Sequence, residues 1–327
     1  MLADTRSRRH RGAPMWALVA AAAAWTALAS VGCGGGGGGG LSVLPGTGPG
    51  GGTVSGDPLP PVMLAVKEVG MVSNILLMDP DGKNQRALSL NSFWPTDASL
   101  DRTGSWVVYT DTGLYSAIRI AKVDGTLDRV LVEGPHDNFE PAFSPDGTKV
   151  AFVSNRTGMP QIYTVSSTGG SPKQITNLPN GAVQPRYSPD GTKIVFVTGV
   201  DADGIYIMNA DGSEIRAVVD TPADESRPSF SPNGEWIVYE ANLATDGSYV
   251  GQIMIVPASG GTPIRRTHSL QYDEDPVYSP DGTKILFTRR IGANGAREIM
   301  SIPASGGSPS QLTADGAVYS GLRSPAL

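Results

Sequence analysis

The sequence has 327 residues, of which 39% are hydrophobic and only 17% are charged, and it carries a formal net charge of −6. Without the first 32 residues, 21 Lys and Arg remain against 30 Asp and Glu, so the net charge becomes −9. An acidic chain of this kind is not expected to bind nucleic acid, because phosphate binding needs a basic surface. The single cysteine, Cys33, excludes an intrachain disulfide.

The first 32 residues have the layout of a secretory signal peptide. Four arginines between Arg6 and Arg11 precede Met15–Val31, a stretch of seventeen uncharged residues that is rich in alanine. A charged segment, an apolar segment and small residues in this order are typical of a signal peptide. The alternative is a transmembrane anchor, for which the stretch is short and weakly hydrophobic.

Cys33 follows this segment directly. The stretch Leu28–Cys33 resembles a bacterial lipobox, with Ser30 where Leu or Val is commonest. We therefore expect a lipoprotein-type signal peptide over residues 1–32, and Cys33 as the lipid-modified new N-terminus. Because stable anchoring needs more than one acyl chain, lipoprotein processing would hold the protein on a membrane of the bacterial cell envelope, at its periplasmic or outer-membrane face.

Residues 33–61 are predicted to be a flexible tether. Gly34–Gly40 is an uninterrupted glycine run, and residues 41–61 add six Gly and five Pro. Such a segment has too little apolar surface to offset the entropy lost on ordering. The tether is expected to hold a folded domain, residues 62–327, away from the membrane.

The folded domain is built from repeats. The motif Ser-Pro-Asp-Gly occurs at Ser144, Ser188 and Ser279, as Ser-Pro-Asn-Gly at Ser231, and in a weaker form at Asp101–Gly104. A proline precedes each copy, and these prolines are separated by 46, 44, 43 and 48 residues. They are Pro95, Pro141, Pro185, Pro228 and Pro276. A fixed period of this size indicates a repeat architecture.

Each repeat is expected to contain four strands. The Ser-Pro-Asp-Gly tetrapeptide suits a chain-reversing turn, and it is followed by an apolar run such as Val150–Val153. The runs do not alternate apolar and polar residues, which indicates strands that are buried on both faces. Gly-Gly and Asp-Gly pairs then mark a hairpin. Four strands in roughly 40–45 residues is the pattern of a propeller blade.

The two ends of the folded domain determine the expected number of blades. Residues 62–90 hold three strand-like pieces without a first strand, and the stretch Gly316–Pro325 parallels the first strand at Gly181–Pro189. We therefore expect an all-β, six-bladed β-propeller of four-stranded antiparallel blades, closed by the C-terminal strand joining the N-terminal blade. Closure would remove the exposed sheet edges of an open array.

These motifs carry a family resemblance. The Ser-Pro-Asp-Gly turn with its apolar run, Ser154-Asn155-Arg156 after it, and Ile162-Tyr163 before a Gly-Gly hairpin are similar to the WD40-like repeats of TolB-type six-bladed propellers. The resemblance implies a periplasmic or surface binding module whose channel mouth receives a partner. TolB has a folded domain before its propeller, where this chain has the Gly/Pro tether, so the Tol–Pal partnership is not carried over.

The sequence does not predict catalysis, a metal site or a cofactor. His136 and His268 are the only histidines after the signal peptide, and neither lies near a second His or a Cys at metal-ligand spacing. A G-x-S-x-G nucleophile motif is absent. The Ser-Pro-Asp-Gly aspartates recur in every repeat, which is typical of a structural turn. The alternative is a propeller-type lyase or hydrolase with its active site at the channel mouth.

The loops that lead into the first strands differ between repeats, as a binding face on a repeat scaffold does. The predicted binding residues at the channel mouth are Trp94, Glu140, Gln184, Arg186, Arg227, Asp273 and Asp275. Because acidic residues predominate there, the mouth is expected to favour a cationic peptide, a basic protein segment or a divalent cation. We expect a monomer whose partner is an envelope protein or peptide.

Overall fold

The computed structural model describes residues 62–325, except Met71, Phe93, 200–203, 246–247 and 292–294. These residues belong to the second of the two compact units of the chain, Pro45–Leu327. The predicted signal peptide, Cys33 and the tether lie outside the described residues and stay predictions. The described residues contain no helix that is long and apolar enough to cross a membrane.

Sixteen of the strands form four separate four-stranded antiparallel sheets. The first sheet contains β4 (Pro95–Leu100), β5 (Trp106–Asp111), β6 (Ala117–Lys122) and β7 (Arg129–Val132). The second contains β8 (Asn138–Phe143), β9 (Lys149–Ser154), β10 (Gln161–Ser166) and β11 (Lys173–Gln174). The third contains β12 (Ala182–Tyr187), β13 (Lys193–Thr198), β14 (Gly204–Asn209) and β15 (Arg216–Val219). The fourth contains β16 (Asp224–Phe230), β17 (Trp236–Thr245), β18 (Ser248–Pro257) and β19 (Ile264–Arg265).

The other eight strands form one sheet. Its first half contains β20 (Asp273–Tyr278), β21 (Lys284–Ile291), β22 (Ala296–Pro303) and β23 (Ser310–Gln311). Its second half contains β24 (Val318–Arg323), β1 (Met63–Val69), β2 (Val72–Met78) and β3 (Arg86–Ala87). A single parallel residue pair, Arg297 and Val318, joins the two halves. The structure therefore has four separate four-stranded blades and one eight-stranded sheet where six blades were expected, because this pairing joins the last eight strands.

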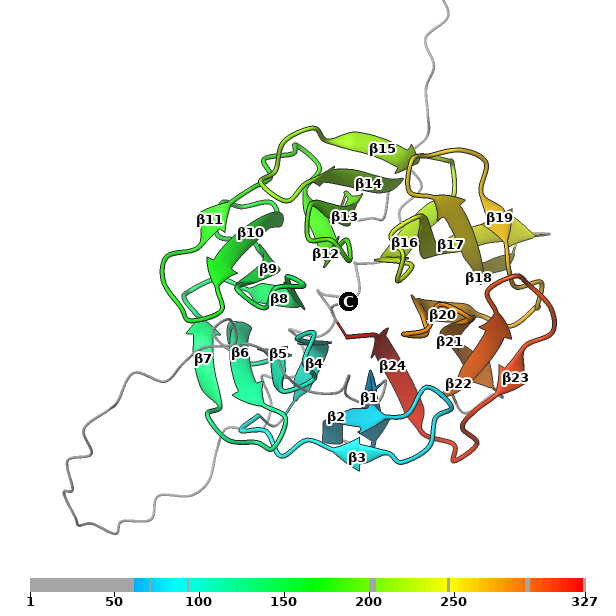
Figure 1. The fold of residues 1–327 in the computed structure, drawn as a ribbon, viewed down its shortest axis with the longest axis horizontal. Helices are drawn as coiled ribbons and strands as arrows, with labels where there is room; N and C mark the ends of the chain where they lie inside the picture. The colour runs from blue at the N-terminus through cyan, green and yellow to red at the C-terminus, as the bar shows by residue number, and fades with distance from the viewer. Residues whose placement is uncertain are drawn as a thin grey trace, which may run out of the picture. The chain divides into compact units, whose positions relative to one another are not determined.

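The innermost strands surround a common centre (Figure 1). Each innermost strand contacts the next in the order β4, β8, β12, β16, β20 and β24, and β24 contacts β4. The C-terminal strand β24 also pairs antiparallel with the N-terminal strand β1, as the repeat phasing predicted. The described part of the chain is thus an all-β propeller with a closed inner ring of strands.

The core lies between the faces of neighbouring sheets. Val108 of the first sheet packs in one cluster with Phe152 and Tyr163 of the second, and the next interface is filled by Phe196. The apolar run Val150–Val153 is fully buried. This confirms the predicted two-sided burial, and each such side chain contributes on the order of 1.5–3 kcal/mol of hydrophobic stabilisation.

The Ser-Pro-Asp-Gly segments are confirmed as turns. The Ser144 hydroxyl donates to Asp146 Oδ1 at 2.6 Å, and the backbone N–H of Thr148 donates to the same oxygen at 3.0 Å. The N–H of Lys149 donates back to Ser144 Oγ at 2.9 Å. The same bonds recur in the copies that begin at Ser188 and Ser279. These aspartates therefore hold their own turns together.

Candidate functional site

Each innermost strand contains a β-bulge, where two of its residues lie opposite one residue of the neighbouring strand. The first residue of each bulge has a positive φ, between 46° and 58°. These residues, which we call the bulge ring, are Asp97, Glu140, Gln184, Arg227, Asp275 and Gly321. A left-handed backbone costs a non-glycine residue roughly 1–2 kcal/mol, so surrounding contacts must hold it in place.

Proline explains where most of the bulges lie. Four of the bulge-ring residues are followed directly by a proline, namely Pro141, Pro185, Pro228 and Pro276. Proline has no N–H to donate to the ladder and is therefore confined to sheet edges and bulges. The first repeat has Ala98 at this position, and Asp97 precedes it in the bulge ring. Pro95 is instead the first residue of β4, so Trp94 lies outside the bulge ring, and its role in binding stays a prediction.

Side chains of the bulge ring connect neighbouring innermost strands. Glu140 Oε2 accepts the backbone N–H of Gln184 at 2.7 Å, and Gln184 Oε1 accepts the N–H of Arg227 at 2.5 Å. Asp275 Oδ2 accepts the N–H of Gly321 at 3.0 Å. Three of the predicted binding residues, Glu140, Gln184 and Asp275, thus bridge from one innermost strand to the next.

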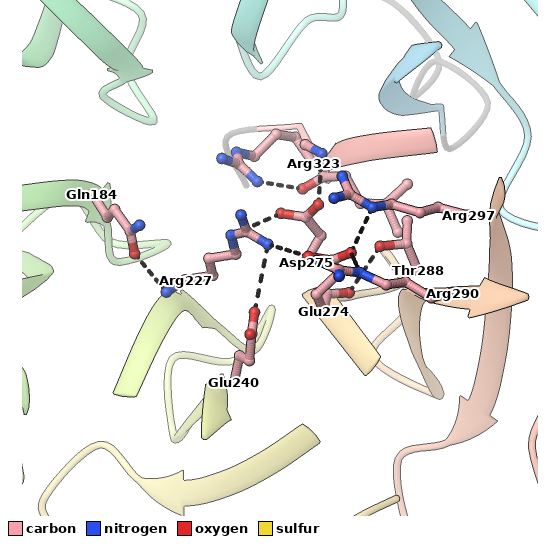
Figure 2. Close-up of polar contacts among 11 residues, drawn as sticks. Gln184, Arg227, Glu240, Glu274, Asp275, Thr288, Arg290, Arg297 and Arg323 are labelled. Atoms are coloured by element: carbon pink, nitrogen blue, oxygen red, sulfur yellow. Dashed lines mark hydrogen bonds and ion pairs between the residues drawn. The ribbon is translucent and has the colours of Figure 1, made fainter. Parts of the chain in front are cut away.

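A network of carboxylates and arginines lies beside the ring on β16, β17 and β20–β22 (Figure 2). Buried Glu274 is 3.2 Å from Arg227, 3.4 Å from Arg290 and 2.8 Å from Arg297. Arg227 also pairs with Asp275 at 3.2 Å and with Glu240 at 3.5 Å.

Burial and neighbouring charges shift the pKa values of Arg227 and Glu240 in opposite directions. Burial alone disfavours the charged form of Arg227, but Asp275, Glu240 and Glu274 outweigh it and raise its pKa. Burial raises the pKa of Glu240 to about 7, although Arg227 opposes this shift.

The predicted acidic rim is therefore not a free acidic surface. Asp273 is fully buried, and Arg289 binds it with two nitrogens at 2.6 and 2.8 Å. Glu274 and Asp275 are buried and paired as described above. The sequence reasoning missed Arg289, Arg290 and Arg297 because it considered only the loops before the prolines. The consecutive arginines near the end of the apolar strand Lys284–Ile291 were the signal that could have revealed them.

Two arginines near the ring have no such partner. Arg186 and Arg323 are half-buried, and each donates from Nη1 to the carbonyl that precedes it, Pro185 O at 2.6 Å and Leu322 O at 2.7 Å. No carboxylate of the described residues lies within ion-pair distance of either guanidinium. Burial, followed by the charge of Arg323, lowers the pKa of Arg186 to about 9. Burial likewise lowers the pKa of Arg323.

Residues 105–250 match the family model described as "TolB beta propeller domain". This stretch of the propeller is similar to TolB-type propeller domains. The "Protein TolB homolog" of Chlorobium luteolum is 33% identical over 89 residues, and the "Tol-Pal system protein TolB" of Shigella flexneri is 32% identical over 81 residues. These alignments cover 27% and 24% of this chain. The chain spans 19% of the length of each of these relatives.

Solved structures share the TolB-type fold. The structure of TolB from Acinetobacter baumannii superposes with a TM-score of 0.68 at 19% identity, over 81% of this chain and 67% of that one. An oligogalacturonate lyase in complex with manganese superposes with a TM-score of 0.56 at 14% identity, over 76% of this chain and 73% of that one. At these identities the likeness shows the fold alone. Within the described ranges, no group of three or more His, Cys, Asp and Glu side chains could hold a metal ion.

The two ends of the TolB-type propeller differ in their exposed side chains. Because neighbouring strands of a sheet are antiparallel, the loops into each innermost strand and those between its second and third strands lie at one end, the mouth. Of ten exposed large hydrophobic side chains in the described part, six lie at the mouth. Four are in its loops, namely Leu114, Tyr115, Met159 and Leu270, and two are at strand ends, Val69 of β1 and Val72 of β2.

The opposite end carries the Ser-Pro-Asp-Gly turns and a cleft of mixed polar and apolar lining. The cleft has a volume of about 350 Å³ and lies between two neighbouring turns, with Asp190, Lys193, Arg216, Ile207 and Phe230 in its lining. The exposed side chains Leu127 and Ile215 also lie at this end, in turns between third and fourth strands. The apolar loop surface is therefore concentrated at the mouth.

Proposed function

We propose that this chain is a protein-interaction module of the bacterial cell envelope, in which the mouth of the propeller binds a segment of a partner protein. The exposed apolar side chains of the mouth loops carry this proposal. Leu114 is 92% exposed and Leu270 is 90% exposed, and neither contributes to the core. Apolar side chains that are exposed at one end of a domain favour an interaction site there. The proposed activity is binding and includes no catalytic step.

The charges of the mouth refine the expected partner. The sequence predicted a basic partner from the acidic residues around Asp273. Asp273, Glu274 and Asp275 already bind arginines of this chain, so they do not support that preference. We propose an envelope protein or peptide that contributes apolar side chains to the mouth loops.

The export signal and lipid anchor belong to this proposal. The arginine-rich start, the uncharged segment up to Val31 and the single Cys33 support lipid attachment to an envelope membrane. Mass spectrometry of the mature protein should find an acylated Cys33 at its N-terminus. A free N-terminus downstream of Gly34 would contradict the anchor.

We also propose that the eight-stranded sheet acts as two blades, which gives a six-bladed monomer. Its halves share only the pair Arg297 and Val318, and each half is otherwise antiparallel. The closed contacts among the innermost strands leave no inner strand that needs a second copy. Light scattering of the purified chain should give the mass of one chain, and a stable dimer would contradict the monomer.

Site-specific photo-crosslinking in the native envelope tests the binding proposal. A photoreactive amino acid replaces Leu114 at the mouth or, as a matched control, Leu127 at the opposite end; both side chains are exposed. We expect a discrete crosslinked protein at position 114 that is absent at position 127, because only the mouth would face the partner. Equal products at both positions, or a product at 127 alone, would contradict the proposal.

A further inference from the structure

Arg186 and Arg323 lie on opposite sides of the inner ring. Arg186 is on β12 and Arg323 is on β24. In the closed order of innermost strands, β16 and β20 separate them on one side, and β4 and β8 separate them on the other. Each follows its bulge-ring residue, Gln184 or Gly321, by two positions, so both occupy the same level of the ring. A group bound between the innermost strands at this level would lie between them.

We propose that Arg186 and Arg323 form a binding site for a carboxylate group of the partner. This inference rests on the proposed function, because the carboxylate would enter through the mouth that binds the partner. A guanidinium can donate two parallel N–H bonds to a carboxylate, and two facing guanidinium groups can hold one carboxylate from both sides. The site thus recognises an aspartate or glutamate side chain or a C-terminus.

Arg186 and Arg323 differ from the other arginines near the bulge ring in their partners. Arg227, Arg289 and Arg297 each lie within 3.2 Å of a carboxylate oxygen. Arg186 and Arg323 donate only to the backbone carbonyl before them among the described residues. Within the described part of the chain, no ion pair neutralises either charge.

Arg323 also has an unsatisfied hydrogen-bond donor. Arg323 Nε is enclosed and has no hydrogen-bond partner among the described residues. A buried donor without an acceptor is unfavourable and needs an explanation. A carboxylate between the two guanidinium groups would supply that acceptor and would also offset the repulsion between the charges.

The nearby carboxylates of this chain do not fill the site. Glu140 accepts the N–H of Gln184, and Asp275 accepts from Gly321 and pairs with Arg227. They favour the charged form of Arg186 only from beyond ion-pair distance. Because these acids surround the site, a singly charged carboxylate fits it better than a dianion such as phosphate.

The test titrates the full chain with acetate, and separately with the capped tripeptides acetyl-Gly-Asp-Gly-amide and acetyl-Gly-Asn-Gly-amide. Nuclear magnetic resonance follows the side-chain Nε–Hε signals of the arginines. We expect the signals of Arg186 and Arg323 to shift saturably with acetate and with the Asp peptide, and not with the Asn peptide. Response to acetate but not to the Asp peptide would restrict the site to free carboxylates and overturn the partner proposal.

Variants make the test specific. Arg186→Gln and Arg323→Gln should each weaken binding by about tenfold, since each removes one charged fork. Arg216→Gln is the matched control, because Arg216 also donates to backbone carbonyls but lies at the opposite end. Arg186→Lys should bind acetate with intermediate affinity. If Arg186→Gln does not fold, the affinity of Arg186→Lys is compared with that of the unmodified chain instead.

Two results would overturn the site. One is the absence of saturable shifts in the unmodified chain up to acetate concentrations of about 100 mM. The other is unchanged affinity in the Arg186→Gln and Arg323→Gln double variant. Acetate binding in a protein that crosslinks nothing at Leu114 would instead reject the proposed function and leave the carboxylate site intact.

Discussion

The Ser-Pro-Asp-Gly turns and the bulge ring recur around the same circle of strands, but each keeps a different property constant. The turns keep their side chains, and Asp146, Asp190 and Asp281 make the same bonds within their own turns. The bulge ring keeps its backbone, with φ between 46° and 58°, while its side chains range from Gly321 to Arg227. The turns act locally, whereas the bulge ring connects neighbouring strands and faces the channel.

This difference indicates which positions of a repeat protein are expected to carry its function. A constant residue that satisfies its own turn is explained by that turn. A constant backbone position with variable side chains allows each strand to present different chemistry at one level of the channel. The following predictions test this contrast, from the largest expected effect to the smallest.

Removal of Glu274 should have the largest effect on stability. Glu274→Ala leaves Arg227 and Arg297 without a shared buried carboxylate, and breaking a buried ion pair from one side costs about 3 kcal/mol. The free energy of unfolding, measured with urea, should fall by this amount. Glu235→Ala is the control, because Glu235 is exposed and its loss should cost less than about 0.5 kcal/mol. Equal losses would show that the network beside the bulge ring is not a stabilising element.

Glu225, two residues before Arg227, should make stability depend on pH. Burial raises its pKa to about 7 from 4.5, and its Oε2 is enclosed without a partner among the described residues. The folded state therefore holds the proton more tightly than the unfolded state. The resulting stability is present below pH 4.5 and is lost as the pH rises through 7.

Denaturant unfolding at a series of pH values checks this prediction. Glu225→Gln should reduce the loss between pH 4.5 and 7, because the amide cannot ionise, and Glu240, whose pKa is also raised to about 7, should account for part of the remaining slope. Glu235→Gln should keep the slope of the unmodified protein. If Glu225→Gln keeps that slope as well, the buried carboxyl is not responsible for it.

The turns should respond equally in each repeat. Asp190→Ala removes the acceptor for Ser188 and Thr192, which should cost about 1–2 kcal/mol and leave partner capture unchanged. Asp190→Asn should be nearly neutral, because Asn233 accepts the equivalent bonds in the fourth copy. Thermal unfolding with the crosslinking assay measures both effects. A turn variant that folds but captures no partner would contradict the purely structural role of the turns.

The smallest effect is expected at Gly321, the glycine of the bulge ring. Its φ is +58°, and a Cβ added there would contact Val66 Cγ2 at an ordinary 3.5 Å. Gly321→Ala should therefore cost only the backbone strain, about 1 kcal/mol. Gly321→Asn should cost less, because asparagine tolerates this conformation. A larger loss for asparagine than for alanine would show that side-chain packing, not backbone conformation, limits this position.

Much of the fold was predictable because the residues of each turn determine its local conformation. The Ser-Pro-Asp-Gly copies placed the second strands, and the phased prolines led to Glu140, Gln184, Arg227 and Asp275 at the bulges. The fusion of the last sheets could not be predicted, because it depends on one parallel pair between Arg297 and a distant strand.

The candidate site was less predictable, because its contacts join residues far apart in the sequence. The first repeat has Ala98 where the others have the proline of the bulge. The proline pattern therefore pointed to Trp94, before Pro95, and not to Asp97. The arginines that neutralise Asp273 and Glu274 follow an apolar strand, where sequence alone does not show which side chain they reach. The left-handed backbone of the bulge ring was hidden because different residues occupy it.

The binding affinity of the crosslinked partner tests the central claim most directly. Leu114→Ser with Tyr115→Ser removes exposed apolar surface at the mouth, and Leu127→Ser with Ile215→Ser removes it at the opposite end. The mouth variant should bind the partner at least about tenfold more weakly than the unmodified chain, and the opposite-end variant should bind equally well. An unchanged affinity in the mouth variant, or a greater loss in the opposite-end variant, would contradict a partner-binding mouth.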